Sequence, residues 1–408
     1  MPDVTAKDTT SGIGRDVAEK TVARLRLMLP PELVPFFGIS FIRSHVLYDE
    51  FVYRLALRVL RESGLEAPLR EPGSAEEIAA RANLEAGRGV VPLDWMLRLL
   101  AERGALEERT DGSTRRYRAR GPLPAPDPGE VKEEQRRHDP SGLPSYVLAE
   151  TVANDYPAFL RGEVVGEEVL FKPRHFRLWI DYFSNANSLY VVNNRVGAVA
   201  LEQWLPRADA AVLELGGGLG SGAVAALERL KSAGRLDAIK EYRFTEFVPA
   251  FLRRGQQALE ARYPGLPCLA FGSVDMNRPF AEQGIAPASL SVVYAVNTLH
   301  VAHDLDFTLG EIRRALEPGG RLIVSECVRP RPGQAIYAEF IFNLTETFRS
   351  PRLHPRYRPV GGFLTPEQWQ GAIEAAGFGD VRFLPDIVRV REQVPDFLVA
   401  VIGATRPA

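Results

Sequence analysis

The chain has 408 residues, of which 45% are hydrophobic and 25% charged, as in a folded globular protein of two or three domains. Its formal charge of −2 argues against a general nucleic-acid-binding protein, which usually carries a strong basic excess. Two cysteines exclude a disulfide framework, and no apolar run reaches the length of about 18 residues that a membrane span needs. We therefore expect a cytoplasmic protein with no signal peptide, no nucleic-acid partner and no membrane partner.

The first 120 residues divide into a short tail and a helical module. We expect residues 1–15 to be a disordered tail and residues 16–120 to form a small, mainly helical domain. The signals for its elements are apolar residues at a helical period over 49–63, a capping box at Ser74 and Glu77, Pro92 and Gly104 at the ends of a third helix, and a hairpin turn at Asp111–Gly112. Three helices followed by a hairpin are typical of a winged-helix domain.

This winged-helix pattern resembles the N-terminal domain of small-molecule O-methyltransferases. In that family the domain dimerises and helps to line the substrate pocket, so the resemblance implies a homodimer.

DNA binding is the alternative function of this domain, because the predicted wing carries several arginines. A helix that reads a DNA groove presents polar and basic side chains. The third helix argues against this role, since Arg98 is the only basic residue in its apolar run from Trp95 to Leu100.

Two further segments precede the C-terminal half. Residues 121–145 are rich in proline and charge and predict a linker. Residues 146–205 return to helical composition, and their aromatic and amide side chains predict a lid over an active site. The later apolar run AIYAEFIFNLTETF fits a pocket lining and a plain core helix equally well. Candidate substrate-pocket residues in these segments are Tyr182, Tyr190, Asn193 and Phe342.

From residue 206 onward, strands and helices alternate along the chain. Apolar runs predict seven strands, at AAVLELG, YRFTEF, CLAFGSV, LSVVYAVN, GRLIVSE, VRFLPD and FLVAVIGAT. Helices are expected between them at 221–233, 249–262, 305–317 and 366–376. This alternation predicts an α/β domain over 206–408, a doubly wound, Rossmann-like sheet that binds ligands at the carboxyl ends of its strands.

A glycine-rich loop follows the first of these strands. In the sequence VLELGGGLG, Glu214 precedes four glycines, Gly216, Gly217, Gly218 and Gly220. The glycines let the backbone turn sharply and approach a ligand with no side chain between them. NAD-dependent enzymes carry a similar loop, and a plain structural turn is the remaining alternative. The spacing E-x-G-x-G-x-G resembles the first motif of class I S-adenosylmethionine methyltransferases, which implies that cofactor and a seven-stranded methyltransferase fold.

Polar residues also end the next strands. Glu246 closes the second strand, where a carboxylate can accept hydrogen bonds from ribose hydroxyls. Asp275 follows the third strand as a candidate acceptor for an adenine amino group, and Asn297 ends the fourth. Each of these could be an ordinary surface residue, but they recur at strand ends that meet in one crevice. With Glu214 and the four glycines, they are the predicted cofactor-binding residues.

His300 and Glu326 are the predicted catalytic pair. His300 comes just beyond the fourth strand and Glu326 ends the fifth, so neighbouring strands would bring the two side chains together. A histidine accepts a proton near neutral pH, and a carboxylate behind it fixes its tautomer and raises its basicity. A hydrogen-bonded histidine that only shapes its loop is the alternative. His303 is a weaker candidate, because Asp304 beside it is expected to cap a helix, and no residue spacing predicts a metal site.

A long segment around this pair is similar to the C-methyltransferase domains of polyketide synthases. It reads YRFTEFVPAFL and then VVYAVNTLHVAHDLDFTLGEIRRALEPGGRLIVSE, with an asparagine-x-leucine-histidine step, a PGG turn and a strand ending in glutamate. In that family the histidine and the glutamate form a dyad that removes an acidic α-proton, so the resemblance implies those roles for His300 and Glu326. The resemblance covers residues 146–390. It does not extend to the N-terminal region, where the winged-helix module is typical of free-standing methyltransferases. A free and a carrier-bound substrate both remain open.

Together these patterns predict an S-adenosylmethionine-dependent methyltransferase of natural-product metabolism. The expected reaction is C-methylation of an activated α-carbon in a ketide-like or other small-molecule substrate, with His300 as general base. The alternatives are O- or N-methylation of a small metabolite, and a winged-helix regulator that binds S-adenosylmethionine without catalysis.

Overall fold

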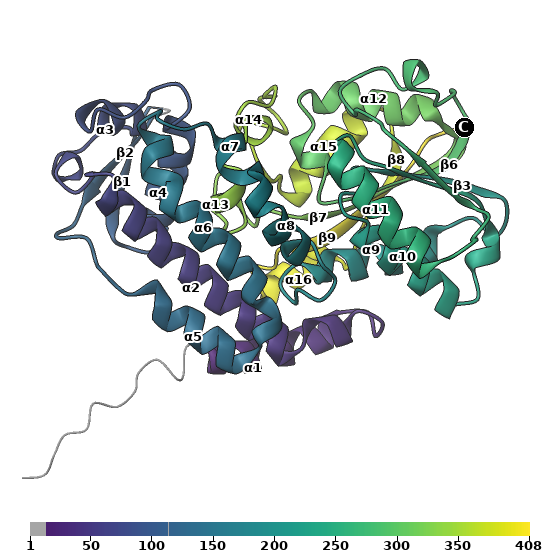
Figure 1. The fold of residues 1–408 in the computed structure, drawn as a ribbon, viewed down its shortest axis with the longest axis horizontal. Helices are drawn as coiled ribbons and strands as arrows, with labels where there is room; N and C mark the ends of the chain where they lie inside the picture. The colour runs from purple at the N-terminus through teal and green to yellow at the C-terminus, as the bar shows by residue number, and fades with distance from the viewer. Residues whose placement is uncertain (1–13, 113) are drawn as a thin grey trace, which may run out of the picture. The chain divides into compact units, whose positions relative to one another are not determined.

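The computed structural model describes residues 14–112 and 114–408 and divides the chain into two compact units (Figure 1). The predicted tail at 1–15 lies almost entirely outside the described residues. The helical unit comprises the residues up to 24, 37–179 and 334–349, and the sheet unit comprises 25–36, 180–333 and 350–408.

The helical unit contains the predicted helices and hairpin in the predicted order. Its first elements are α1 (Arg15–Met28), whose last turn belongs to the sheet unit, α2 (Ile39–Glu62), α3 (Ala75–Arg81), α4 (Val90–Glu102), β1 (Leu106–Asp111) and β2 (Thr114–Ala119). The expected capping box starts α3, because Ser74 and Glu77 each accept a hydrogen bond from the other's backbone N–H. The apolar side chains of α4 from Leu93 to Leu100 are buried, so this part of the helix packs inside the unit.

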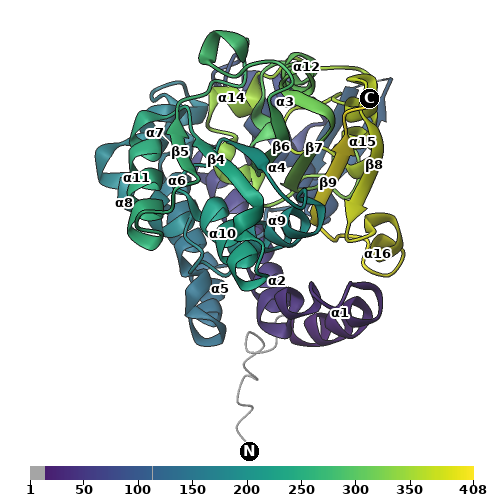
Figure 2. The same ribbon diagram turned by 90° about the vertical axis from the view of Figure 1, so that its right-hand side faces the viewer.

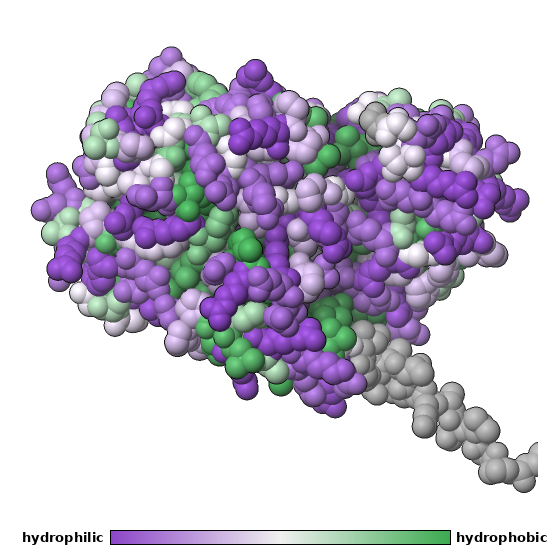
Figure 3. Space-filling model, turned by 180° about the vertical axis from the view of Figure 1, so that it is seen from behind, coloured by the Kyte–Doolittle hydropathy of each residue, from purple (hydrophilic) through white to green (hydrophobic). Residues whose placement is uncertain are grey.

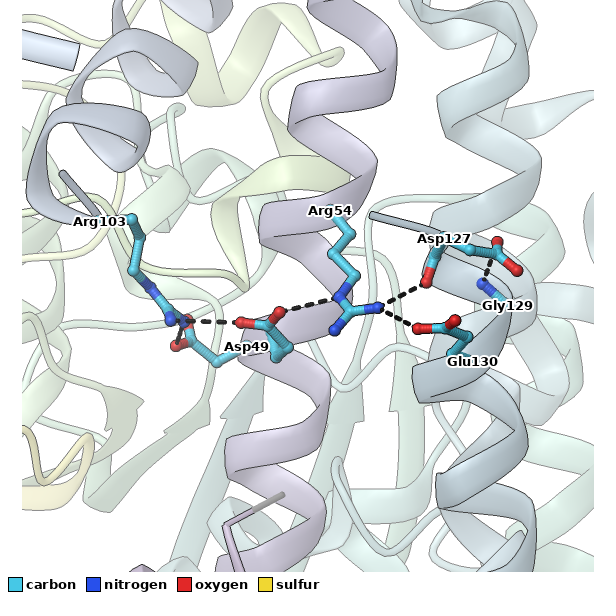
Figure 4. Close-up of polar contacts among 7 residues, drawn as sticks. Asp49, Arg54, Arg103, Asp127, Gly129 and Glu130 are labelled. Atoms are coloured by element: carbon cyan, nitrogen blue, oxygen red, sulfur yellow. Dashed lines mark hydrogen bonds and ion pairs between the residues drawn. The ribbon is translucent and has the colours of Figure 1, made fainter. Parts of the chain in front are cut away.

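The predicted linker at 121–145 contains a helix instead. α5 (Pro128–His138) begins with Asp127 as its N-cap and Pro128 in its first turn, a common start for a helix. Arg54 of α2 donates hydrogen bonds to the Asp127 carbonyl and the Glu130 carboxylate, at 2.8 and 2.9 Å (Figure 4). Composition alone predicted a linker, but these contacts and the packing of α5 on α2 hold the segment in place.

The predicted lid at 146–205 is divided between the units. α6 (Leu143–Leu160), α7 (Gly166–Phe171) and the first half of α8 (Phe176–Tyr182) belong to the helical unit, and α9 (Val191–Trp204) belongs to the sheet unit. α9 packs directly on the sheet, since a Cβ added at Gly197 would lie 2.6 Å from the Tyr294 hydroxyl. Most side chains of α9 are buried against the sheet. This helix is therefore a packed layer of the sheet unit rather than a lid, since apolar side chains are stabilised where water is excluded.

Residues 334–349 fold into the helical unit although they come late in the chain. They form α13 (Glu339–Phe342) and α14 (Glu346–Arg349). Trp95 Nε1 donates a hydrogen bond to Glu339 Oε2 at 2.9 Å, and the Tyr156 hydroxyl donates one to the Phe340 carbonyl at 2.9 Å. Phe340 and Ile341 are buried, so these two side chains of the apolar run belong to the core of the helical unit.

The sheet unit confirms the predicted doubly wound fold. Within the described residues its seven strands lie in the order β5-β4-β3-β6-β7-β9-β8, and only β9 runs antiparallel to its neighbours. The strands are β3 (Ala210–Leu215), β4 (Ile239–Thr245), β5 (Leu269–Gly272), β6 (Leu290–Val296), β7 (Leu316–Cys327), β8 (Gly379–Leu384) and β9 (Val399–Thr405). The helices are α10 (Ser221–Ser232), α11 (Pro249–Arg262), α12 (Leu305–Ala315), α15 (Pro366–Ala375) and α16 (Ile387–Gln393). One face of the sheet packs against α9, α10 and α11, and the other against α12 and α15 (Figure 2).

The central strands form the core of the sheet unit. Every side chain of β6 is buried, as expected for a parallel strand covered on both faces. β3, β6 and β7 end at the same edge of the sheet, which brings the loops after them together. The face drawn in Figure 3 is mostly hydrophilic with scattered hydrophobic patches. In the described ranges, no helix combines the length and apolar character needed to cross a bilayer.

Candidate active site

The glycine loop turns between β3 and α10, as predicted. Gly216, Gly218 and Gly220 have φ angles of +60°, +57° and +87°, which residues with side chains disfavour. A Cβ added at Gly217 would lie 2.2 Å from the Phe244 ring, whereas nothing lies within 4 Å of a Cβ added at Gly218. The loop therefore presents bare backbone at the N-terminus of α10, an arrangement that admits a closely bound ligand.

Glu246 and Glu214 are the two acidic side chains predicted at this loop. Glu246, just after β4, accepts hydrogen bonds from Gly218 N at 2.9 Å and from Val248 N at 2.8 Å. Glu214, in β3, is 1% exposed and accepts a hydrogen bond from the Tyr242 hydroxyl at 2.9 Å. Burial raises the pKa of both carboxyl groups, that of Glu214 to about 8. Glu246 thus contacts the glycine loop directly, while Glu214 lies in the interior with a tyrosine partner that the sequence did not indicate.

Asp275 and Asn297 follow the ends of β5 and β6. Asp275 is half-buried, and its Oδ1 accepts a hydrogen bond from Asn277 N at 2.9 Å. Asn297 has a φ angle of +48°, and its backbone N donates to Ser325 O while its Oδ1 accepts from Cys327 N, both at 2.8 Å. These bonds tie the end of β6 to β7, so the Asn297 side chain already has a structural role. A contact of either residue with a cofactor stays a prediction.

His300 and Glu326 meet, as their positions on neighbouring strands predicted. His300 lies in the short 3-10 helix η7 (Leu299–Val301), and its Nδ1 is 2.8 Å from Oε2 of Glu326 in β7. The other carboxylate oxygen, Oε1, accepts hydrogen bonds from the backbone N–H groups of residues 298, 299 and 300, at 3.2, 3.0 and 3.4 Å. His300 is 5% exposed and Glu326 is fully buried.

This geometry defines which imidazole nitrogen is basic. A carboxylate only accepts hydrogen bonds, so Nδ1 of His300 donates to Glu326 and Nε2 is the nitrogen that can take up a proton. The ring of Phe363 covers the imidazole, with 4.2 Å between the ring centroids. The pair can therefore act as a general base whose tautomer is set by a buried carboxylate.

The weaker histidine candidate lies outside this arrangement. His303 is exposed, and the Asp304 side chain caps α12 by accepting a hydrogen bond from Phe307 N at 3.1 Å, as expected. Among the residues that the structure describes, no group of three His, Cys, Asp or Glu side chains is placed to hold a metal ion.

The four candidate substrate residues lie in different places. Tyr182 and Tyr190 are neighbours in the sheet unit, with ring centroids 5.7 Å apart. Asn193 is buried in α9, where its carbonyl accepts a hydrogen bond from Ser325 Oγ at 2.8 Å and its Nδ2 has no partner among the described residues. Phe342 is in α13 of the helical unit. Their contact with a substrate stays a prediction.

One residue of this region was missed by the sequence patterns. Arg358 is 1% exposed, and its guanidinium donates hydrogen bonds to the carbonyls of His300 and Ala302 at 2.7 and 2.6 Å. It comes from the arginine-rich stretch RLHPRYRPV, in which Arg352 and Arg356 are exposed. No local signal separates the buried arginine from the exposed ones, because the difference arises only from the fold.

Comparisons with known proteins identify a methyltransferase domain in this chain. Residues 213–324, from β3 to β7, match the family model described as a methyltransferase domain. Highly reducing polyketide synthase 2 of Gibberella zeae is 30% identical over 246 residues, which are 58% of this chain and 9% of that synthase. The chain thus spans less than a tenth of the length of this relative.

Solved structures share the fold over nearly the whole chain. The CurJ carbon methyltransferase superposes with a TM-score of 0.74 at 20% identity, covering 98% of this chain and 99% of that one. The trans-methyltransferase CalH, in complex with SAH, has a TM-score of 0.60 at 20% identity and covers 88% of this chain and 90% of that one. The likeness to CurJ therefore includes the N-terminal region, where the sequence resemblance was expected to end. This chain carries a methyltransferase domain, its fold is that of the CurJ carbon methyltransferase, and its sequence relatives include a polyketide synthase.

Proposed function

We propose that this chain is an S-adenosylmethionine-dependent carbon methyltransferase that acts on an activated α-carbon of a ketide-like substrate, with His300 as the general base. The observation that carries the proposal is the 2.8 Å contact between His300 Nδ1 and Glu326 Oε2. Backbone N–H groups of the same loop bind the other oxygen of that carboxylate, so the pair is built into the fold at the edge of the sheet that also carries the glycine loop.

The loop after β3 fits the methyl donor. Gly216, Gly217, Gly218 and Gly220 would hold the donor against bare backbone. Glu246 uses two backbone N–H groups, and a carboxylate offers about four lone-pair sites, so acceptor capacity remains for ribose hydroxyls. Asp275 is proposed at the adenine end of the same site, and Asn297 and Glu214 are proposed as further cofactor-binding residues. When bound, S-adenosylmethionine supplies an electrophilic methyl group and leaves as S-adenosylhomocysteine.

His300 would prepare the acceptor carbon. A carbon between a ketone and a thioester carbonyl bears an acidic proton, and Nε2 takes that proton while the electron pair passes into an enolate. The resulting imidazolium keeps its hydrogen bond from Nδ1 to Glu326, whose negative charge stabilises it. The proton is later released to solvent. Burial of both side chains supports this step, because exclusion of water protects the enolate from reprotonation.

Several finer features belong to the same proposal. The resemblance to polyketide synthases supports a ketide-like thioester, either free or bound to a carrier protein. The helices and hairpin from α2 to β2 are proposed as a winged-helix-like homodimerisation region of a cytoplasmic enzyme. Light scattering over a tenfold range of protein concentration tests the dimer, and a monomer throughout would contradict it.

The experiment uses a β-ketoacyl thioester of pantetheine. Without methyl donor in heavy water, the enzyme should exchange the α-hydrogens, and with S-adenosylmethionine it should add a methyl group to the α-carbon. His300→Gln should lose at least about 100-fold of both rates, the lower end of general-base catalysis, and keep its affinity for S-adenosylhomocysteine. His303→Gln, an exposed histidine three residues along, is the matched control and should keep both rates.

Two results would contradict the proposal. Wild-type exchange and turnover in His300→Gln would remove the histidine from the mechanism. Methylation at oxygen or nitrogen, with no catalysed exchange at carbon, would favour the alternative of an O- or N-methyltransferase.

A further inference from the structure

A strap, defined as residues 350–365, holds the loop that carries His300. Arg358 donates hydrogen bonds to the His300 and Ala302 carbonyls, at 2.7 and 2.6 Å. Arg352 N donates to the His303 carbonyl at 2.7 Å. Phe363, near the other end of the strap, covers the imidazole ring. The strap therefore contacts the backbone and the ring of the same histidine.

Arg358 is an unusual residue to find in this place. Its side chain is buried, and its hydrogen-bond partners within the described residues are carbonyl groups rather than carboxylates. Burial lowers the pKa of its guanidinium to about 10, against the attraction of Asp304 and Asp306. Burying a cation without a carboxylate partner is costly. An apolar side chain would avoid this cost but would leave the carbonyls of residues 300 and 302 without these donors, so the carbonyl contacts are what the arginine supplies here.

Glu326 and Arg358 bind opposite kinds of backbone group in the turn at residues 298–302. Glu326 accepts hydrogen bonds from the N–H groups of residues 298–300, and Arg358 donates to the carbonyls of residues 300 and 302. The negative charge thus faces the donors at the start of the turn, and the positive charge faces the acceptors at its end. Glu326 also holds the imidazole through Nδ1. The Glu326 carboxylate fixes the orientation of the His300 ring, and the Arg358 guanidinium fixes the position of the His300 backbone.

We propose that Arg358 is a positioning residue for the general base, which keeps the backbone of His300 in place so that Nε2 stays aimed at the substrate carbon. The inference rests on the proposed function, since it takes His300 to be the base. Arg329 makes the strap a firm support, because its buried guanidinium donates to the Phe363 and Gly361 carbonyls at 2.9 and 3.1 Å.

The test compares Arg358→Met and Arg358→Lys with a matched control, Arg391→Met. Arg391 is half-buried, and burial lowers its pKa as it lowers that of Arg358. It donates hydrogen bonds to the carbonyls of residues 328–330 and 397 rather than to the His300 loop. Six quantities are measured: kcat for methyl transfer, the rate of α-hydrogen exchange, KM for the β-ketoacyl thioester, the Kd of S-adenosylhomocysteine, the melting temperature, and deuterium uptake of the peptide that spans residues 298–303.

We expect Arg358→Met to lower kcat and α-hydrogen exchange by about 10- to 100-fold, as a misplaced catalytic group does. Its KM and its Kd for S-adenosylhomocysteine should stay close to the wild-type values, and only the 298–303 peptide should take up deuterium faster. Arg358→Lys keeps the charge and one or two of the contacts, so it should recover part of kcat. Arg391→Met should leave kcat and this peptide unchanged.

Two outcomes would overturn the inference. One is a wild-type kcat in Arg358→Met. The other is a parallel loss of kcat, cofactor affinity and melting temperature in Arg358→Met, Arg358→Lys and Arg391→Met, which indicates general damage to the fold. A failure of the proposed function is recognised separately, because it requires wild-type turnover in His300→Gln.

Discussion

Glu326→Gln isolates the negative charge behind His300. The substitution keeps the size of the side chain and removes one acceptor. In the wild type, Oε2 faces the imidazole N–H and Oε1 faces three backbone N–H groups, so an amide NH₂ on either side would face a donor. The variant must therefore either turn its NH₂ group toward His300, which moves the imidazole proton from Nδ1 to Nε2 and removes the basic nitrogen, or leave the turn at residues 298–300 without its acceptor.

Both the rate and the stability should respond. The substitution weakens hydrogen bonds to a buried carboxylate, and a hydrogen bond to a charged group is worth about 1.5–3 kcal/mol. For a unit of this size, each kcal/mol lowers the melting temperature by about 2–4 °C, so we expect a fall of about 5–10 °C. Loss of the carboxylate that fixes a catalytic histidine's tautomer lowers kcat by as much as about 10⁴-fold. We expect kcat to fall by about 10²- to 10⁴-fold.

The assay pairs calorimetric melting with methyl transfer to the β-ketoacyl thioester. Glu311→Gln is the matched control, since Glu311 is also a buried glutamate of the sheet unit and accepts a hydrogen bond from Phe280 N at 2.7 Å. It should lose stability but keep its turnover. If Glu326→Gln melts early yet turns over at the wild-type rate, the carboxylate is only structural and the argument for the dyad is refuted.

Three further predictions concern the glycine loop and its carboxylates. In Gly217→Ala the new Cβ meets the Phe244 ring, and overpacking of about 1–3 kcal/mol should raise the Kd of S-adenosylhomocysteine about 5- to 100-fold in calorimetry, whereas wild-type affinity would show that the loop adapts. Glu246→Ala removes the acceptor for Gly218 N and the proposed ribose contact, so the same titration should show a Kd about tenfold higher or more, and an unchanged Kd would remove Glu246 from the site. The pKa of Glu214 rises from 4.5 to about 8 on folding, so the folded chain retains a proton that the unfolded chain has lost, and stability should fall as pH rises through this range. Urea denaturation at several pH values checks this slope, which Glu214→Gln should reduce; an equal slope in that variant would assign it to other groups.

The fold of the sheet unit follows from signals that lie close together in the sequence. The apolar runs of β3, β6 and β7 and the alternation with helices predicted all seven strands and their doubly wound arrangement. The glycines after Glu214 and the positions of His300 and Glu326 at the ends of neighbouring strands placed the candidate site, because parallel strands end at one edge of a sheet. Resemblance to a known family then supplied the roles of the pair.

What the sequence did not predict depends on distant contacts. The sequence of α5 is typical of a linker, but in the fold Arg54 donates hydrogen bonds to the first turn of this helix. By its position in the sequence Asn297 is a candidate cofactor-binding residue, but its side-chain oxygen accepts a hydrogen bond from the β7 backbone. Arg358 cannot be told from its exposed arginine neighbours until the strap folds over the His300 loop. In each case the deciding partner lies far away in the chain, where periodicity and spacing carry no information.

The placement of residues 334–349 in the helical unit has a consequence for biosynthesis. Trp95 and Tyr156 find their hydrogen-bond partners 244 and 184 residues further along the chain. On the ribosome, all of β3 to β7 is therefore made before the helical unit can finish its own interior. Contacts over such separations close slowly, and the growing chain must keep an incomplete aromatic interior from aggregating in the meantime. No single truncation point separates the two units. A separate helical unit would therefore need residues 334–349 to be fused to residues 37–179.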